Sequence, residues 1–200
     1  MNAIQYFLAL DLELNNAPNN ATPNPKIIQV GIAIGTWDHY AEDQIIKHKW
    51  YLDPEEPIYP FITELTGITD EDIKNKSVSW ELMARQLGSL IDQYKPFLNP
   101  ITWGGGDSRE LLDEFKRREI SFPYFGHRWV DVKTWYVLHR LAKGQSATGG
   151  LRSAMGNYKL HFQGETHRAD DDALNTLRLF FKILDQQSQI NTVLNLAKEI

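Results

Sequence analysis

Five residues of this chain could together bind hard divalent cations and activate a water molecule. They are Asp11 and Glu13 in LALDLELN, Asp107 in WGGGDSRE, and His167 with Asp172 in THRADDDA. Carboxylate oxygens are ligands that suit Mg²⁺ and Mn²⁺, and a neutral imidazole can accept a proton from water. Because a two-metal phosphodiester hydrolase needs these groups, the pattern indicates phosphodiester hydrolysis.

Asp11 and Glu13 lie two residues apart in a run of strand-forming residues. Their side chains should therefore project from the same face of a strand, while Leu10, Leu12 and Leu14 face the core. Two unpaired carboxylates side by side repel each other and are costly unless a cation lies between them. Taken alone, the pair also fits an exposed hairpin edge.

Asp107 follows Gly104, Gly105 and Gly106 and begins an expected helix. Asp often serves as the N-cap of a helix, which is one interpretation. The other is that the glycines let a substrate backbone approach closely while Asp107 faces the cations. These two roles exclude each other only in part, and the motif alone leaves both open.

His167 lies five residues before Asp172, at the start of an expected helix with an apolar stripe. A single histidine is more often a surface or capping residue than a catalyst. Asp170 and Asp171 are explained by the preference of helix N-termini for negative charge. An imidazole placed just before a helix, with Asp172 pointing inward, is nevertheless the arrangement that a general base beside a metal ligand requires.

The elements that position these residues alternate between strands and helices. Strand patterns cover residues 3–14, 26–37 and 43–52, and helical patterns cover 61–98 in two pieces, with Ser79 capping the second. A short strand and glycine turn over 99–106 precede a helix over 107–120, and a strand passes into a helix over 128–142. Further helices are expected over 149–160 and 169–187. The Asn- and Pro-rich segment 16–25 should be a surface loop at the rim of the site.

This order predicts an α/β fold with a mixed β-sheet. Three consecutive strands favour antiparallel pairing, and later strands joined through helices favour parallel pairing, so helices should flank the sheet. A length of 200 residues suits one domain. We expect its core over about residues 4–184 and a short C-terminal helix over 190–200.

Composition limits the classes of protein further. The chain has no cysteine, which excludes disulfides, thiolate metal sites and a cysteine nucleophile. With no membrane span or secretion signal in the sequence, the expectation is a soluble cytoplasmic protein without a membrane partner. The net charge is −5, yet residues 109–182 hold 13 Lys and Arg against 9 Asp and Glu. These basic residues predict a phosphate-tracking surface, or simply solvated helix faces. The candidates are Arg109, Lys116, Arg117, Arg118, Arg128, Lys133, Arg140, Arg152, Lys159 and Arg168.

The three motifs, in this order, resemble those of the DEDDh 3′-to-5′ exonucleases, the DnaQ-like branch of the RNase H-like fold. The similarity extends to PKIIQVGIA, to ELTGIT and to the closing stretch around THRADDDALNT, and it covers about residues 4–184. The TWGGGD form of the second motif and the DDA-x-N ending look most like the ERI-type exoribonucleases.

The resemblance implies a metal-dependent exonuclease that releases nucleoside 5′-monophosphates from single-stranded nucleic acid 3′ ends, with RNA favoured over DNA. Two divalent cations, Mg²⁺ or Mn²⁺, are implied. Asp11, Glu13 and Asp172 would hold one, and Asp11 with Asp107 the other. His167 would be the general base, so that activity falls on the acid side of pH 7. The backbone near Leu14 and the side chain of Leu65 would grip the terminal nucleotide. Trp103 is either a stacking residue or a buried strand aromatic.

Other functions share part of this pattern. A DNA proofreading exonuclease that acts with a polymerase would have the same five residues, although the tail NTVLNLAKEI gives such a partner only weak support. A non-catalytic nucleic-acid-binding module is expected to have lost a carboxylate, and none is missing. A two-carboxylate glycosidase leaves Asp107, His167 and Asp172 without a role. Because some short members of the resembled family complete each other's sites, a homodimer remains among the expected assemblies.

Overall fold

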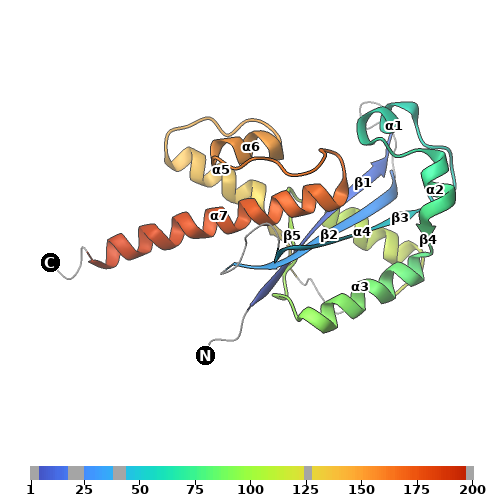
Figure 1. The fold of residues 1–200 in the computed structure, drawn as a ribbon, viewed down its shortest axis with the longest axis horizontal. Helices are drawn as coiled ribbons and strands as arrows, with labels where there is room; N and C mark the ends of the chain where they lie inside the picture. Colours follow the sequence, from blue (N-terminus) through green and yellow to red (C-terminus); the bar gives the residue numbers. More distant parts are fainter. Residues whose placement is uncertain (1–4, 18–24, 38–43, 124–127, 197–200) are drawn as a thin grey trace.

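The computed structural model describes residues 5–17, 25–37, 44–123 and 128–196, with side chains described up to residue 190. Its centre is a mixed sheet with the strand order β4-β3-β2-β1-β5-β6 (Figure 1). The strands are β1 (Tyr6–Asn15), β2 (Lys26–Thr36), β3 (Ile46–Leu52), β4 (Ser77–Val78), β5 (Ile101–Thr102) and β6 (Val130–Asp131). β1, β2 and β3 pair antiparallel, whereas β4, β5 and β6 are parallel to their neighbours, which confirms the predicted mixed sheet.

Helices cover both faces of this sheet (Figure 1). They are α1 (Pro60–Thr66), α2 (Asp70–Lys76), α3 (Trp80–Tyr94), α4 (Gly106–Arg117), α5 (Val132–Ala142), α6 (Leu151–Asn157) and α7 (Ala169–Leu196). Residues of α5, α6 and α7 form one core cluster with Ala9, Ala33 and Ile101. Residues of α3 and α4 form a second cluster with Leu8, Leu10 and Leu12. Alternation along β1 therefore directs Asp11 and Glu13 toward the face that α7 covers.

The number of helices in one expected helical segment differs from the prediction. The segment expected as two helical pieces contains three, because α1 ends at Gly67 in the left-handed conformation before α2 begins. The cap of α3 by Ser79 is confirmed, since its side chain accepts the backbone N–H of Leu82.

The expectation of a separate helix over 190–200 is wrong where the structure describes it. α7 runs without a break from Ala169 to Leu196, because no Gly or Pro interrupts it. Residues 197–200 lie outside the described residues, as do residues 18–24 of the predicted Asn- and Pro-rich loop. Among the helices described, none is long and apolar enough to cross a membrane.

Candidate active site

The two carboxylates of the first motif lie on β1, which pairs with β2 along its length and with β5 at Ala9. Asp11 is opposite Gly31 of β2 and Glu13 is opposite Gln29, and the pairing register shifts immediately after Glu13. Glu13 is buried, with 7% of its surface exposed. The hairpin-edge interpretation is therefore wrong, because β1 is an interior strand and its carboxylates face the side that α7 covers.

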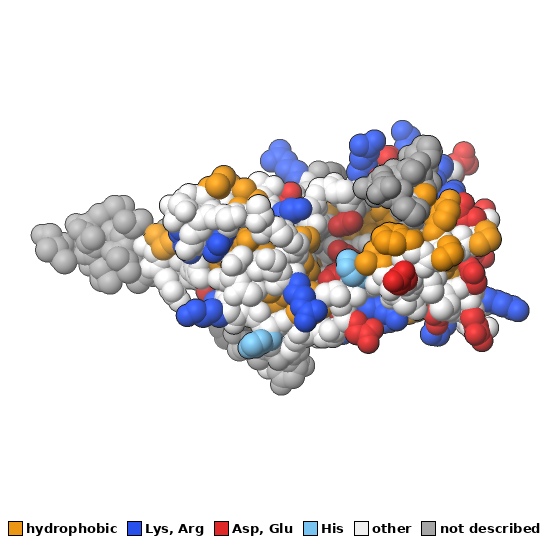
Figure 2. Space-filling model, turned by 90° about the horizontal axis from the view of Figure 1, so that it is seen from above, with side chains coloured by type: hydrophobic (Ala, Val, Ile, Leu, Met, Phe, Trp, Pro, Cys, Tyr) orange, Lys and Arg blue, Asp and Glu red, His pale blue; other side chains and the backbone are white. Residues whose placement is uncertain are grey.

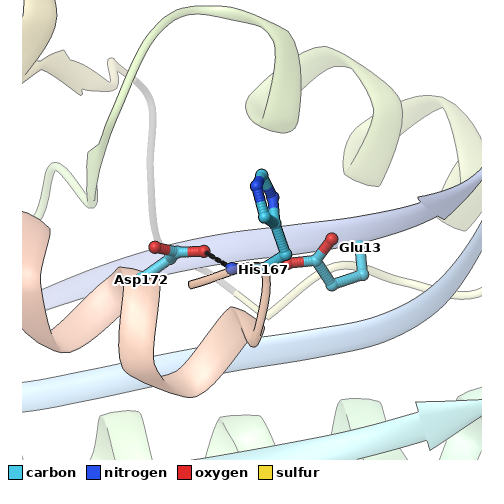
Figure 3. A group of neighbouring side chains, drawn as sticks. All are labelled: Glu13, His167 and Asp172. Atoms are coloured by element: carbon cyan, nitrogen blue, oxygen red, sulfur yellow. Dashed lines mark hydrogen bonds between the residues drawn. The ribbon is translucent and has the colours of Figure 1, made fainter. Parts of the chain in front are cut away.

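The third motif lies where the chain enters α7. His167 has a left-handed φ of 61°, and its backbone N–H donates to Oδ2 of Asp172 at 2.9 Å. Ligand atoms of Glu13, His167 and Asp172 lie within 4.8 Å of one another. Figure 3 shows the two carboxyl groups on either side of the His167 backbone, while the imidazole points away from the helix. Residues more than 150 positions apart in the chain thus form one cluster.

Asp107 lies in the first turn of α4, but it does not cap that helix. The N-cap is Gly105, without a side-chain cap hydrogen bond. Burial raises the pKa of Asp107 to about 7, with further contributions from the charges of Asp172, Glu110 and Asp131. Of the two interpretations of Asp107, the structure favours the one in which its carboxyl group faces the other acids.

Burial and mutual repulsion dominate the electrostatics of the cluster. Burial, then the charges of Asp107, Glu13 and Asp172, raise the pKa of Asp11 well above its ordinary value. Burial and the charges of Asp172 and Asp107 raise the pKa of Glu13 to about 8. Burial raises the pKa of Asp172 to about 6, although backbone N–H groups of His167 and Arg168 oppose the shift. The charge of Arg168 opposes the shift at Glu13, but it does not offset burial and the repulsion between the acids.

Such a donor set fits a hard divalent cation. Within the part of the chain that the structure describes, the tightest candidate metal group combines two carboxylates with one imidazole. Asp11 and Asp107 lie outside this group of three, although the charge of Asp172 raises the pKa of both and the charge of Asp107 raises that of Asp11. Oxygen-rich sites of this kind suit Mg²⁺ or Mn²⁺, and a cation would relieve the repulsion that burial strengthens.

The residues expected to contact the nucleotide differ in how exposed their side chains are. Leu65 of α1 is 40% exposed, and Phe61, one turn earlier, is 48% exposed. Figure 2 shows acidic side chains in a recess, with hydrophobic side chains gathered beside it at the end of the molecule that carries α1. Leu14 is half-buried against the α3 side of the core. Trp103 is half-buried just after the end of β5, and its ring centroid lies 5.8 Å from that of Tyr136, so much of it packs against α5.

Several of the ten basic residues proposed as a phosphate-tracking surface form ion pairs with nearby acidic residues. Arg117 and Arg118 both pair with buried Glu114, and Arg118 also reaches Glu55. These pairs fit the interpretation of solvated helix faces better than that of a phosphate-tracking surface. Arg168 also pairs with a nearby acid, Glu165, but its guanidinium lies against Gly67 and its charge lowers the pKa of Glu13.

Sequence reasoning missed the residues that support the motifs. Asp131 accepts hydrogen bonds from the Gly104 N–H, the Thr134 N–H and the Thr134 hydroxyl, so it holds the glycine turn that precedes Asp107. Its place before a helix was a capping signal. Asp170 and Asp171 bind Lys47 and Lys49 of β3 and thus tie α7 to the sheet.

Asn15 also supports the site from the end of β1. Its side chain donates to Glu56 and to the Pro57 carbonyl, and it accepts the Tyr59 N–H. These contacts attach the start of α1 to the strand that carries Asp11 and Glu13. No local pattern in the sequence signalled this link.

Comparison with known proteins places this geometry in a family. The exonuclease family model RNase T matches residues 8–180. The human ERI1 exoribonuclease 2 is 31% identical over 156 residues, which are 67% of this chain and 22% of that protein. The ERI1 exoribonuclease 2 of Danio rerio is 29% identical over 161 residues, 70% of this chain and 28% of the relative. The chain thus spans roughly a quarter of the length of these relatives.

Two further similarities cover almost the whole chain. The probable 3′-5′ exonuclease KapD of Bacillus subtilis (strain 168) is 25% identical over 189 residues, 91% of this chain and 85% of that protein. The nuclease domain of 3′hExo, a DEDDh family member bound to rAMP, has a TM-score of 0.78 at 15% identity and covers 92% of this chain and 94% of its own. This likeness confirms the predicted RNase H-like fold. The chain belongs to the RNase T exonuclease family.

Proposed function

We propose that this protein is a metal-dependent 3′-5′ exonuclease that releases nucleoside 5′-monophosphates from single-stranded nucleic acid. The observation that carries the proposal is the cluster of buried Glu13 with half-buried Asp11, Asp107 and Asp172, and with His167 at its open side. The acids come from β1, α4 and α7, and their pKa values are raised by burial and by one another. Residues 4–184 would form the exonuclease domain.

Asp11, Glu13, Asp107 and Asp172 would hold two divalent cations, Mg²⁺ or Mn²⁺. When bound, such cations neutralise charge on the phosphodiester and lower the pKa of water. The carboxylates must be ionised to bind them, so the pKa values raised by burial make metal affinity increase with pH. Glu13 and Asp172, which flank His167, would orient the attacking water beside the imidazole.

His167 would act as the general base. Its imidazole is exposed and points away from α7 (Figure 3). The hydrogen bond from its backbone N–H to Asp172 holds the residue next to the carboxylates without using the ring nitrogens. The ring is therefore available to take a proton from the attacking water, provided that it is neutral.

RNA is the substrate class that the relatives favour. ERI1 exoribonuclease 2 is an exoribonuclease by name, and the 3′hExo nuclease domain was solved with rAMP. In this protein, the backbone near Leu14 and the exposed side chain of Leu65 would contact the last nucleotide, and Trp103 would stack with its exposed part. DNA is the second candidate, because the name of KapD specifies a 3′-5′ exonuclease without specifying RNA.

The test is digestion of matched 5′-labelled single-stranded RNA and DNA with Mn²⁺ or Mg²⁺. We expect a ladder that shortens from the 3′ end, faster on RNA, and abolished by EDTA and by Asp11→Asn. A faster ladder on DNA would transfer the proposal to DNA processing. A folded, Mn²⁺-binding protein that shortens neither substrate would contradict the proposed activity.

A further inference from the structure

Two residues of β2, Gln29 and Gly31, lie directly under the first residues of α7. Gln29 is fully buried, and its Oε1 accepts the backbone N–H of Ala169 at 2.9 Å. A Cβ atom added to Gly31 would lie 2.0 Å from the carbonyl carbon of Ala169 and 2.1 Å from the nitrogen of Asp170. Both neighbours are backbone atoms, so α7 would have to move to accommodate any larger residue. The helix therefore begins in direct contact with β2.

The same two residues are the sheet partners of the catalytic carboxylates. Gln29 is opposite Glu13, and Gly31 is opposite Asp11. Opposed residues of an antiparallel pair project to the same face with Cβ atoms about 4.5–5.5 Å apart. The contact that locates Ala169 is thus at the level of the sheet where Asp11 and Glu13 lie. His167 precedes Ala169 by two positions and Asp172 follows it by three.

The environment of Gln29 indicates a role other than favourable burial. Its Nε2 has no hydrogen-bond partner among the described residues. A buried amide group left half-unpaired costs free energy compared with an apolar side chain of similar size. A backbone N–H can only donate, so the Ala169 contact needs the carbonyl oxygen of Gln29. The contact with the start of α7 therefore explains why a glutamine stands at this position although its Nε2 is buried without a partner.

We propose that Gln29 and Gly31 are positioning residues that place the first turn of α7 so that His167 and Asp172 meet Asp11 and Glu13. This inference rests on the proposed function for what the assembled site does. Its physical content is that a small displacement of α7 separates ligand atoms that now lie within 4.8 Å. The two residues act on metal affinity and turnover through Asp172 and His167, without touching the substrate.

The decisive comparison is Gly31→Ala against Gly35→Ala. Gly35 lies on the same face of β2, but a Cβ there would meet side-chain carbons, 3.0 Å from Ile45 and 3.6 Å from Leu177. Those side chains can shift, whereas the Ala169 backbone can move only with the helix. We expect Gly31→Ala to weaken Mn²⁺ binding by about 10–100-fold, the range typical of residues that orient metal ligands, and to lower kcat more than it raises KM. Gly35→Ala should leave Mn²⁺ binding unchanged, even if it lowers Tm.

Gln29→Met provides a second variant that introduces no backbone collision. It removes the acceptor for the Ala169 N–H and keeps a side chain of similar length. We expect weaker Mn²⁺ binding, measured by calorimetry on the metal-free protein, and faster hydrogen exchange of the Ala169 amide. The exchange measurement needs neither metal nor substrate.

The outcomes separate this inference from the proposed function. Unchanged Mn²⁺ affinity and kcat in folded Gly31→Ala and Gln29→Met would overturn the inference and leave the exonuclease intact. If the wild-type protein neither bound Mn²⁺ nor digested nucleic acid, the proposed function would fail. Amide exchange would then judge the positioning contact, and unchanged rates over residues 169–172 in both variants would overturn it as well.

Discussion

At the scale of single residues, the acidic cluster is held in an unfavourable state of charge. Burial raises the pKa of Glu13 to about 8, that of Asp107 to about 7 and that of Asp172 to about 6, and neighbouring acids reinforce the shift. Their ordinary values are 4.5 for Glu and 3.8 for Asp. Ionisation of these groups therefore opposes folding, unless a cation compensates for it.

The first prediction concerns the stability of the metal-free protein. With raised pKa values, the folded state binds more protons than the unfolded state between about pH 4 and pH 8, so stability falls as pH rises through this window. We expect a lower Tm at pH 8 than at pH 5, measured by calorimetry in EDTA. Asp107→Asn should flatten this dependence. A Tm that increases from pH 5 to pH 8 would contradict the raised pKa values.

Removing one charge tests the metal role of the acids. Asp11→Asn and Asp172→Asn should reduce exonuclease activity to the level of the EDTA control, while the Tm in EDTA stays equal or increases because repulsion is relieved. Asp113→Asn, at an exposed acid of α4 outside the cluster, is the matched control. Full activity of a folded Asp11→Asn variant would exclude the proposed ligand.

His167→Ala separates catalysis from binding. Loss of a general base should lower kcat by about 10²–10⁴-fold, with a much smaller change in the affinity for an oligonucleotide. Single-turnover kinetics with Mn²⁺ and a binding measurement at the same pH make the comparison. Equal losses of turnover and affinity would instead identify His167 as a binding residue.

At the scale of elements, the second motif depends on a turn that is held from both sides. Asp131, the N-cap of α5, accepts the Gly104 N–H at 3.1 Å, and the Thr102 hydroxyl donates to the Gly104 carbonyl at 2.7 Å. Gly104 has a φ of 99°, which favours glycine. Strands β5 and β6 thus locate the turn from which α4 presents Asp107.

Asp131→Ala should therefore affect stability and activity together. Loss of the cap costs about 0.5–2 kcal/mol of unfolding free energy, and release of the turn displaces Asp107. Urea denaturation and the exonuclease assay measure the two effects. Asp131→Asn retains an acceptor for the backbone N–H groups, so it should lose less of both. Wild-type activity in a folded Asp131→Ala variant would show that the turn keeps its shape without this residue.

At the scale of the whole molecule, the site is completed by folding from segments far apart in the chain. β1 lies inside the sheet, α4 starts beyond β5, and α7 crosses the face to which Asp11 and Glu13 point (Figure 1). Ion pairs from Lys47 and Lys49 to Asp170 and Asp171 attach α7 to β3. Metal binding should therefore be linked to global stability.

Added Mn²⁺ or Mg²⁺ should raise the Tm, and EDTA should reverse the increase. A cation at 100 times its Kd stabilises the folded state by about 2.7 kcal/mol. In a domain of this size, each kcal/mol corresponds to about 2–4 °C. Asp172→Asn should lose most of the increase, whereas Gly35→Ala should keep it. The same increase in wild-type protein and Asp172→Asn would place the bound cation elsewhere.

The sequence by itself predicted most of the elements and the residues of the candidate site. Alternation along β1 predicted that Asp11 and Glu13 share a face, the Ser79 cap located α3, and the spacing of His167 and Asp172 placed both at the start of a helix. These features follow from local periodicity and capping, which operate over a few residues. The order of the motifs indicated the family, and the order of strands and helices predicted the mixed sheet.

The tertiary structure decided which local interpretation holds. It showed that Asp107 faces the acids and does not cap α4, that Asp170 and Asp171 bind lysines of β3, and that Gln29 and Gly31 receive the start of α7. Each of these outcomes depends on a partner far away in the chain, 140 positions for Gln29 and Ala169. Local patterns predict which residues can form a contact. Only packing of the helices on the sheet brings the partners within reach, because contact energies act over a few ångströms.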